Sequence, residues 1–170
     1  MLDLLKESSM ATITEGRTCG ECTACCFTHR IPAISKLGNE WCKSCDIGKG
    51  CKIYELRPQD CREWKCMWLK GTGTDAHRPD KLGIVLDMEH MVFVGWTLKL
   101  MEATRGALES EYMLRWAIDA SSRGVPVLFM PITGTKTLMV PRDQYARLGN
   151  TRIGFEGADG KEEVEIVPGI

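Results

Sequence analysis

The chain has 170 residues, of which 44% are hydrophobic and 26% charged, and its formal net charge is -1. This length supports one ordinary domain with a hydrophobic core, and the composition is typical of a soluble globular protein. The near-neutral charge disfavours a general nucleic-acid binder, and the lack of any run of about 18 apolar residues argues against a membrane span.

The first 18 residues lack the basic start, apolar middle and cleavage site of a secretory signal, so we expect a flexible N-terminus on a cytoplasmic protein. All nine cysteines follow, between Cys19 and Cys66. Clustered cysteines in a reducing cytosol are more often metal ligands than disulfides. We therefore predict a cysteine-rich metal-binding region over residues 19–75, packed in one compact domain with residues 76–170.

The cysteine spacing favours metal binding, because a CxxC pair lets two thiolates reach one ion from a tight turn. Two such pairs, 22/25 and 42/45, are separated by sixteen residues, which falls within zinc-ribbon spacing. The predicted metal ligands are Cys19, Cys22, Cys25, Cys26, Cys42, Cys45, Cys51 and Cys61. Their pairing stays open, because adjacent Cys25 and Cys26 point in different directions and suit either two ions or a polynuclear cluster.

Cys66 is the doubtful ninth ligand. Pro58 suits the first position of a helix, which we expect to run through Leu69 and to stop at Gly71. On that helix Cys66 would lie about 140° from Cys61. A buried thiol that only packs is the alternative for Cys66.

The cysteine-free remainder predicts an α+β unit with a small mixed or antiparallel sheet and one main helix. Residues 82–87 and 91–100 are expected to form a hairpin that turns over 88–90. Residues 109–124 repeat apolar residues at helical spacing, with Met113, Leu114, Ala117, Ile118 and Ala120 on one face. Two strands joined around Gly134, a short helix over 141–149 and a final hairpin across 158–160 complete a sheet of four to six strands.

The segments CGECTACC, WCKSC and GKGCKIYELRPQDCREW resemble the zinc- or iron-chelating family named for its CxxCxxCC motif, whose members are often labelled YkgJ-like cysteine cluster proteins. The resemblance covers residues 19 to about 70, with all eight cysteines in order. It implies a metal-binding module. A flagellin lysine N-methylase associated with an iron-sulfur centre belongs to that family, but this chain shows no loop that would hold a methyl donor.

Basic and aromatic residues accompany the thiols. Two zinc ions with eight thiolates leave a charge of about -4, and a four-iron cluster with four thiolates about -2, so donors and cations are needed nearby. Arg57 and Arg62 are expected to supply them, and Tyr54 is expected to shield the site. A solvated helix-start pair is the alternative for the two arginines. Among the histidines only His29 is weighed as a ligand or neighbour of the centre.

Three functions remain. The favoured one is a metal-binding module that chelates one or two Zn²⁺ ions, or iron, with no membrane contact and an unknown protein partner. The second is a protein with a [4Fe-4S] cluster or mononuclear iron, acting in electron transfer or in a modification such as lysine methylation. The third is a zinc-knuckle adaptor, for which nucleic acid is an unfavoured partner. We favour binding over catalysis and assign no catalytic residue.

Overall fold

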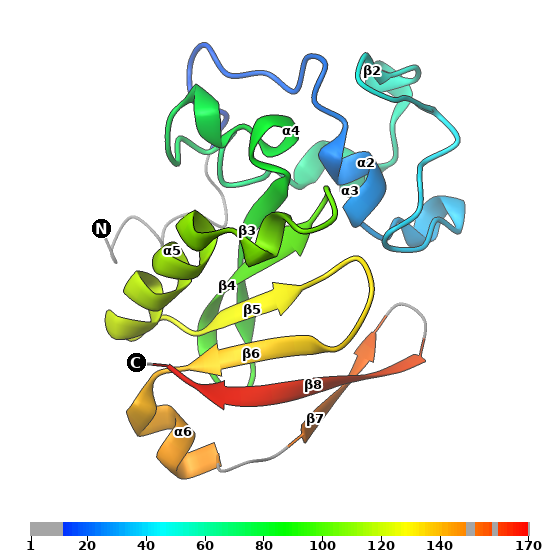
Figure 1. Ribbon diagram of the computed structural model, residues 1–170. Helices are drawn as coiled ribbons and strands as arrows, with labels where there is room; N and C mark the ends of the chain where they lie inside the picture. The colour runs from blue at the N-terminus through cyan, green and yellow to red at the C-terminus, as the bar shows by residue number, and fades with distance from the viewer. Residues whose placement is uncertain (1–11, 149–151, 158–159, 170) are drawn as a thin grey trace.

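A computed structural model describes residues 12–148, 152–157 and 160–169 of the chain. The N-terminal half contains short elements (Figure 1). These are α2 (Ala24–Thr28), η2 (Pro32–Ile34), β1 (Cys45–Asp46), β2 (Gly50–Cys51), η3 (Tyr54–Leu56), α3 (Gln59–Glu63), η4 (Asp75–His77) and α4 (Pro79–Leu82). The longer elements follow: β3 (Ile84–Met91), β4 (Gly95–Glu102), η5 (Ala107–Glu109), α5 (Glu111–Ser122), β5 (Val127–Met130), β6 (Lys136–Val140), α6 (Arg142–Leu148), β7 (Arg152–Gly157) and β8 (Gly160–Pro168).

The six longer strands form one mixed sheet in the order β3-β4-β5-β6-β8-β7. The β4–β5 and β6–β8 pairs are parallel, and the other three pairs are antiparallel. Parallel neighbours need a crossover connection, which α5 provides between β4 and β5. The predicted α+β class and strand number are confirmed. The final hairpin also forms, although its turn at 158–159 lies outside the described residues.

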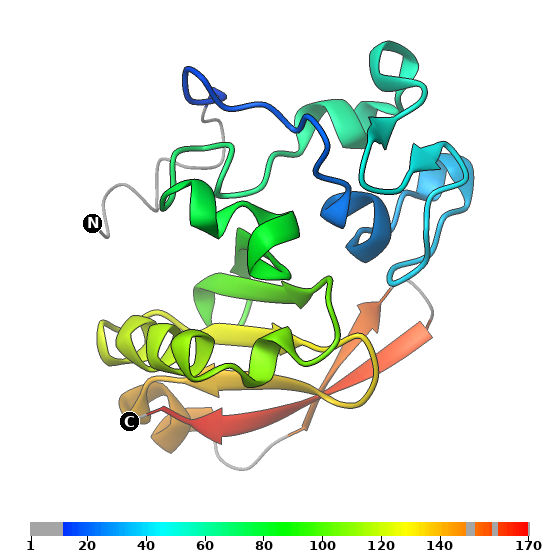
Figure 2. The ribbon, with the colours of Figure 1, turned by 45° about the horizontal axis from the view of Figure 1, so that its top comes forward.

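Helix α5 packs on one face of the sheet (Figure 2). The Ser110 side chain accepts a hydrogen bond from the backbone N–H of Met113, so the helix begins where a cap is available. Met113 and Ala117 are buried among Leu98, Leu100 and other strand residues of this face. Leu114, which we expected on the buried face, is 43% exposed, so the buried stripe is narrower than predicted.

The β3–β4 hairpin forms with a different turn from the predicted one. Residues 88–90 continue β3, and His90 pairs with Trp96. The chain turns instead over 92–94, where Val92 and Phe93 are exposed. Met88 is buried in the same core as Leu86, which extends the strand beyond the predicted end.

The helix expected from Pro58 through Leu69 ends at Glu63, and this part of the prediction is wrong. Trp64 has extended backbone, and its indole Nε1–H donates to Asp87 Oδ2 at 2.8 Å. Three residues later the Met67 backbone N–H donates to the Leu86 carbonyl at 2.9 Å. Pairing with the edge of β3 therefore replaces helical hydrogen bonds and attaches the cysteine-rich region to the sheet.

Residues 12–18 belong to the segment expected to be flexible, of which residues 1–11 lie outside the described part. The Thr14 backbone N–H donates to the Leu69 carbonyl at 2.9 Å. The Arg17 guanidinium lies over the Trp68 ring and donates to the carbonyls of Thr72 and Gly73 at 3.0 and 2.6 Å. These contacts tie the segment that leads into Cys19 to the loop after Cys66.

Within the described residues, every helix is too short or too polar to cross a lipid bilayer.

Candidate metal centre

Two tight turns present the CxxC pairs Cys19/Cys22 and Cys42/Cys45. The Cys22 backbone N–H donates to the Cys19 carbonyl at 2.8 Å, and Cys45 does the same to Cys42 at 2.9 Å. Each turn therefore brings the two cysteines that flank it onto one side of the backbone. Helix α2 follows the first turn and carries Cys25 and Cys26.

Backbone contacts bring the distant cysteine segments together. The Cys42 backbone N–H donates to the Cys26 carbonyl at 3.0 Å, which joins the second CxxC turn to α2. In the small β1–β2 pair, Cys45 lies directly opposite Cys51. Gly50 has a φ of 130°, and a Cβ there would lie 3.1 Å from the Gly20 carbonyl oxygen. Glycine therefore permits the close approach of the backbone at Gly50 to the backbone at Gly20.

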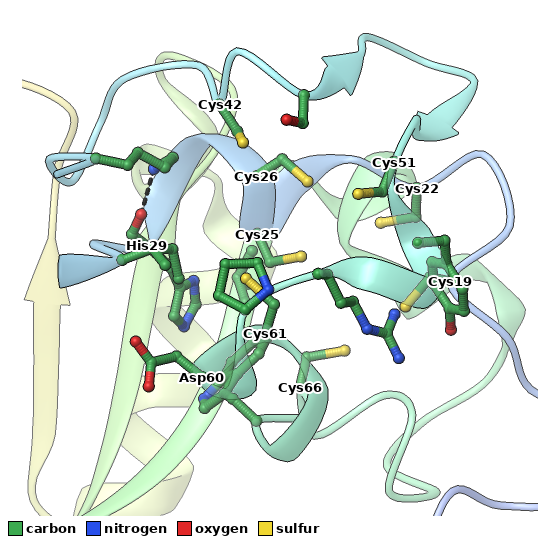
Figure 3. Close-up of a pocket in the computed structure, with 18 of the residues that line it drawn as sticks. Cys19, Cys22, Cys25, Cys26, His29, Cys42, Cys51, Asp60, Cys61 and Cys66 are labelled. Carbon is green, nitrogen blue, oxygen red and sulfur yellow. Dashed lines mark hydrogen bonds between the residues drawn. The ribbon is translucent and has the colours of Figure 1, made fainter. Parts of the chain in front are cut away.

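Eight cysteines line a single cavity of about 250 Å³ (Figure 3). They are Cys19, Cys22, Cys25, Cys26, Cys42, Cys51, Cys61 and Cys66. The doubtful Cys66 is thus among the lining residues, while predicted Cys45 is not. The Cys45 thiol nevertheless hydrogen-bonds with Cys26. All nine cysteines are free thiols.

The thiols line one cavity, but they do not converge on a common coordination point. Across residues 12–148, 152–157 and 160–169, no three histidine, cysteine or acidic side chains lie close enough together to hold a metal ion. Binding of an ion would have to draw these thiols inward.

The Cys26 thiol has a lowered pKa. Its pKa is lowered to about 6 by a hydrogen bond from the Cys25 thiol and a second one from Cys45, with help from Lys36 and Arg57. The pKa of Cys25 is raised in return, first by that hydrogen bond and then by burial. Cys26 is therefore the thiol best prepared to be a thiolate near neutral pH.

Burial keeps most of the other thiols protonated. It raises the pKa of Cys22 to about 11 and that of Cys45 to about 12. Burial also raises the pKa of Cys19, Cys61 and Cys66. Loading a metal would release protons from these thiols, so its affinity should rise with pH.

Arg57 is placed as a cation for this cluster. Its guanidinium lies 3.7 Å from the centre of the Tyr54 ring, and both side chains line the cavity. Within the described part of the chain, Arg57 Nε is buried and has no hydrogen-bond partner. A thiolate or other anion in the cavity would satisfy this donor. Arg62, expected to share the role, is exposed on α3 and does not line the cavity.

Lys36 is a second cation, and no pattern in the sequence singled it out. Its ammonium group is buried and donates to the carbonyls of Phe27, His29 and Leu37. Burial lowers its pKa, and the thiols of Cys42, Cys26 and Cys25 oppose that shift. Lys36 therefore satisfies carbonyls at the end of α2 and places positive charge beside three candidate ligands.

His29 also lines the cavity. Its ring contacts the Trp64 ring at a tilt of 51°, with centroids 3.8 Å apart. Burial, followed by the charges of Lys99 and Lys36, lowers its pKa to about 3, so the imidazole is neutral near pH 7. Its place three residues after Cys26 was the only signal in the sequence for this position.

No family model, curated protein or solved structure matches the chain. The resemblance to the CxxCxxCC family therefore stays a prediction.

Proposed function

We propose that this protein binds zinc or iron through cysteine thiols in and beside its cavity, with Cys45 among the ligands and Cys66 outside them, and that it acts in the cytoplasm as a metal-binding module. The observation that carries the proposal is the convergence of eight cysteines from five backbone segments on one cavity. Thiolate is a preferred ligand of zinc and of iron-sulfur clusters. Nine free thiols also suit a reducing compartment.

The charges around the cavity support one dianionic centre over two zinc sites. Lys36 and Arg57 both act on the Cys26 thiol, and each also lies near other candidate ligands. Their two positive charges match a centre of about -2, which is the charge of one zinc with four thiolates or of a four-iron cluster. Arg30 also lines the cavity, but two zinc sites with eight thiolates, at about -4, would exceed the charge of all three cations.

The size of the cavity favours the iron-sulfur alternative over a single zinc ion. Zinc holds its sulfur ligands at about 2.3 Å, so four thiolates close tightly around it. A cavity of about 250 Å³ lined by eight cysteines leaves room for a polynuclear cluster without full collapse of the walls. A cluster bound here would supply redox chemistry, and the chain would supply thiolate ligands, Arg57 as a hydrogen-bond donor and a partly apolar lining.

Metal identity and stoichiometry, measured on protein prepared without oxygen, test the proposal. An iron-sulfur protein would be brown, with a charge-transfer band, whereas a zinc protein would be colourless. We expect one centre per chain by elemental analysis. A preparation that takes up neither zinc nor iron, including after reconstitution with iron and sulfide, would refute the function.

Three serine variants test the ligand assignment. Cys22→Ser and Cys45→Ser should lower the bound metal, because each removes a predicted thiolate. Cys66→Ser is the matched control and should retain it, because the Cys66 thiol packs against Trp68 and Leu69. Full metal content in both of the first two variants would overturn the ligand set.

A further inference from the structure

His29 presents an unused nitrogen to the cavity. His29 is half-buried, and its Nδ1 lies 2.9 Å from the Thr28 hydroxyl oxygen. Within the described residues, Nδ1 is the only nitrogen of this ring with a hydrogen-bond partner. His29 lines the same cavity as the cysteines (Figure 3).

Neighbouring groups fix the ring in one orientation. The Trp64 ring packs against the His29 ring in a tilted contact, and Trp64 is itself held by its hydrogen bond to Asp87. The His29 backbone N–H donates to the Cys25 carbonyl at 3.1 Å, so the residue is bound to the helix that carries Cys25 and Cys26. Thr28 is buried and can accept from Nδ1–H, which leaves the lone pair of Nε2 for the cavity.

We infer that His29 is a nitrogen ligand of the metal centre and that Thr28 holds its tautomer, an inference that rests on the metal-binding function proposed above. Metal-bound histidines commonly donate their second ring N–H to a neighbouring acceptor, and in this tautomer Nδ1–H would donate to Thr28. A neutral imidazole adds no negative charge, so it limits the excess that Arg30, Lys36 and Arg57 must offset in this cavity. The centre then has mixed sulfur and nitrogen ligands.

Cobalt spectroscopy on the full chain tests the ligand. Co²⁺ added without oxygen to metal-free protein gives sulfur-to-cobalt charge-transfer absorbance that grows with the number of bound thiolates. In a four-coordinate centre, His29→Cys should raise this absorbance by about one third, because three thiolates become four. His29→Gln should weaken Co²⁺ binding at least about tenfold. His90→Gln, which alters an exposed ring in edge-to-face contact with Trp96, is the matched control and should change neither.

Nitrogen NMR of the unsubstituted chain with Zn²⁺ gives a readout that does not depend on how a variant folds. His29 Nε2 should shift to the position of a metal-bound nitrogen while Nδ1 stays protonated, with the signals assigned by His77→Gln and His90→Gln. Thr28→Val should reduce the affinity about tenfold, and Thr28→Ser should restore it, because serine keeps the acceptor.

The outcomes separate the two proposals. Tight metal binding with an unshifted His29 Nε2 and unchanged absorbance in His29→Cys overturns the nitrogen ligand alone. A wild-type chain that binds neither Co²⁺ nor Zn²⁺ overturns this inference, and failure with iron and sulfide as well overturns the proposed function.

Discussion

Residues 84–140 and residues 19–66 bury their side chains to very different degrees. In the first segment Ile84, Leu100 and Leu138 have no exposed surface. In the second, the buried residues are few and include Thr23, Thr28 and Lys36, which are polar. The sheet region thus has its own hydrophobic core, whereas the cysteine-rich region surrounds a cavity. Burial can stabilise the first without a ligand, whereas under the proposed function the second would gain much of its stability from the metal that its thiols bind.

Metal removal should produce the largest difference between the two regions in protection from hydrogen exchange. Structural zinc sites contribute on the order of 10 kcal/mol to the folding of small domains, so residues 19–66 should lose most of their protection from hydrogen exchange when the metal is removed. Residues 84–140 should keep theirs. Exchange followed by mass spectrometry, with and without metal, measures both. Equal loss in the two regions would show that they fold as one unit.

Leu100→Ala should destabilise the sheet region and leave metal binding unchanged. Leu100 is fully buried beneath α5, and such truncations cost about 2–5 kcal/mol. Urea unfolding of the metal-loaded protein should show this loss, while the metal content per folded chain should stay unchanged. Loss of metal from the folded variant would mean that the sheet core holds the centre in shape.

Cys66→Ser should have a smaller effect on stability. Its side chain is buried with Trp68 and Leu69, so the polar hydroxyl should cost about 1–2 kcal/mol of unfolding free energy. Urea unfolding of metal-free protein isolates this packing effect from any effect on the centre. A stability equal to that of the wild type would show that the Cys66 site is hydrated.

Asp87, which accepts a hydrogen bond from Trp64 where the two regions meet, predicts a modest pH dependence of the unfolding free energy. Burial raises the pKa of Asp87 above its usual 3.8, although Trp64 and then Lys70 act to lower it. The folded protein therefore holds this proton more tightly than the unfolded chain does. The contribution of Asp87 to stability should rise as the pH falls through the raised pKa towards 3.8.

Asp87→Asn should remove that contribution, because asparagine does not titrate. Urea unfolding at several pH values between neutral and 4 compares the two proteins. Asp75 and Asp80, whose pKa values are lowered, should act in the opposite direction only at more acid pH. An unchanged pH profile in Asp87→Asn would exclude Asp87 as the source.

The contrast between the regions also explains what the sequence could predict. Helix α5 follows from local signals, namely the Ser110 cap, the spacing of Met113 and Ala117, and Gly124 after the end. The 58–69 helix failed because Trp64 and Met67 bond to β3 residues that are distant in sequence. Local propensity cannot anticipate such partners.

Within the candidate site, the cysteine spacing predicted which segments would converge but not the cations beside them. Lys36 donates to a carbonyl of α2 and lies near the thiols of Cys25, Cys26 and Cys42. No local sequence pattern predicts this arrangement. Arg62 follows the predicted ligand Cys61 directly, yet α3 directs it to solvent. The direction of a side chain depends on the packed backbone, so it could not be read from spacing.

The attachment of Met67 to the β3 edge has a consequence for biosynthesis. The ribosome completes Cys66 before it makes Leu86, whose carbonyl holds the following residue. The parallel β6–β8 pair delays completion of the sheet until residues 164–168 are made. At about 5–20 residues per second, the nascent thiols wait several seconds for their docking surface. Under the proposed function, metal delivery would therefore compete with oxidation of the thiols before the fold covers them.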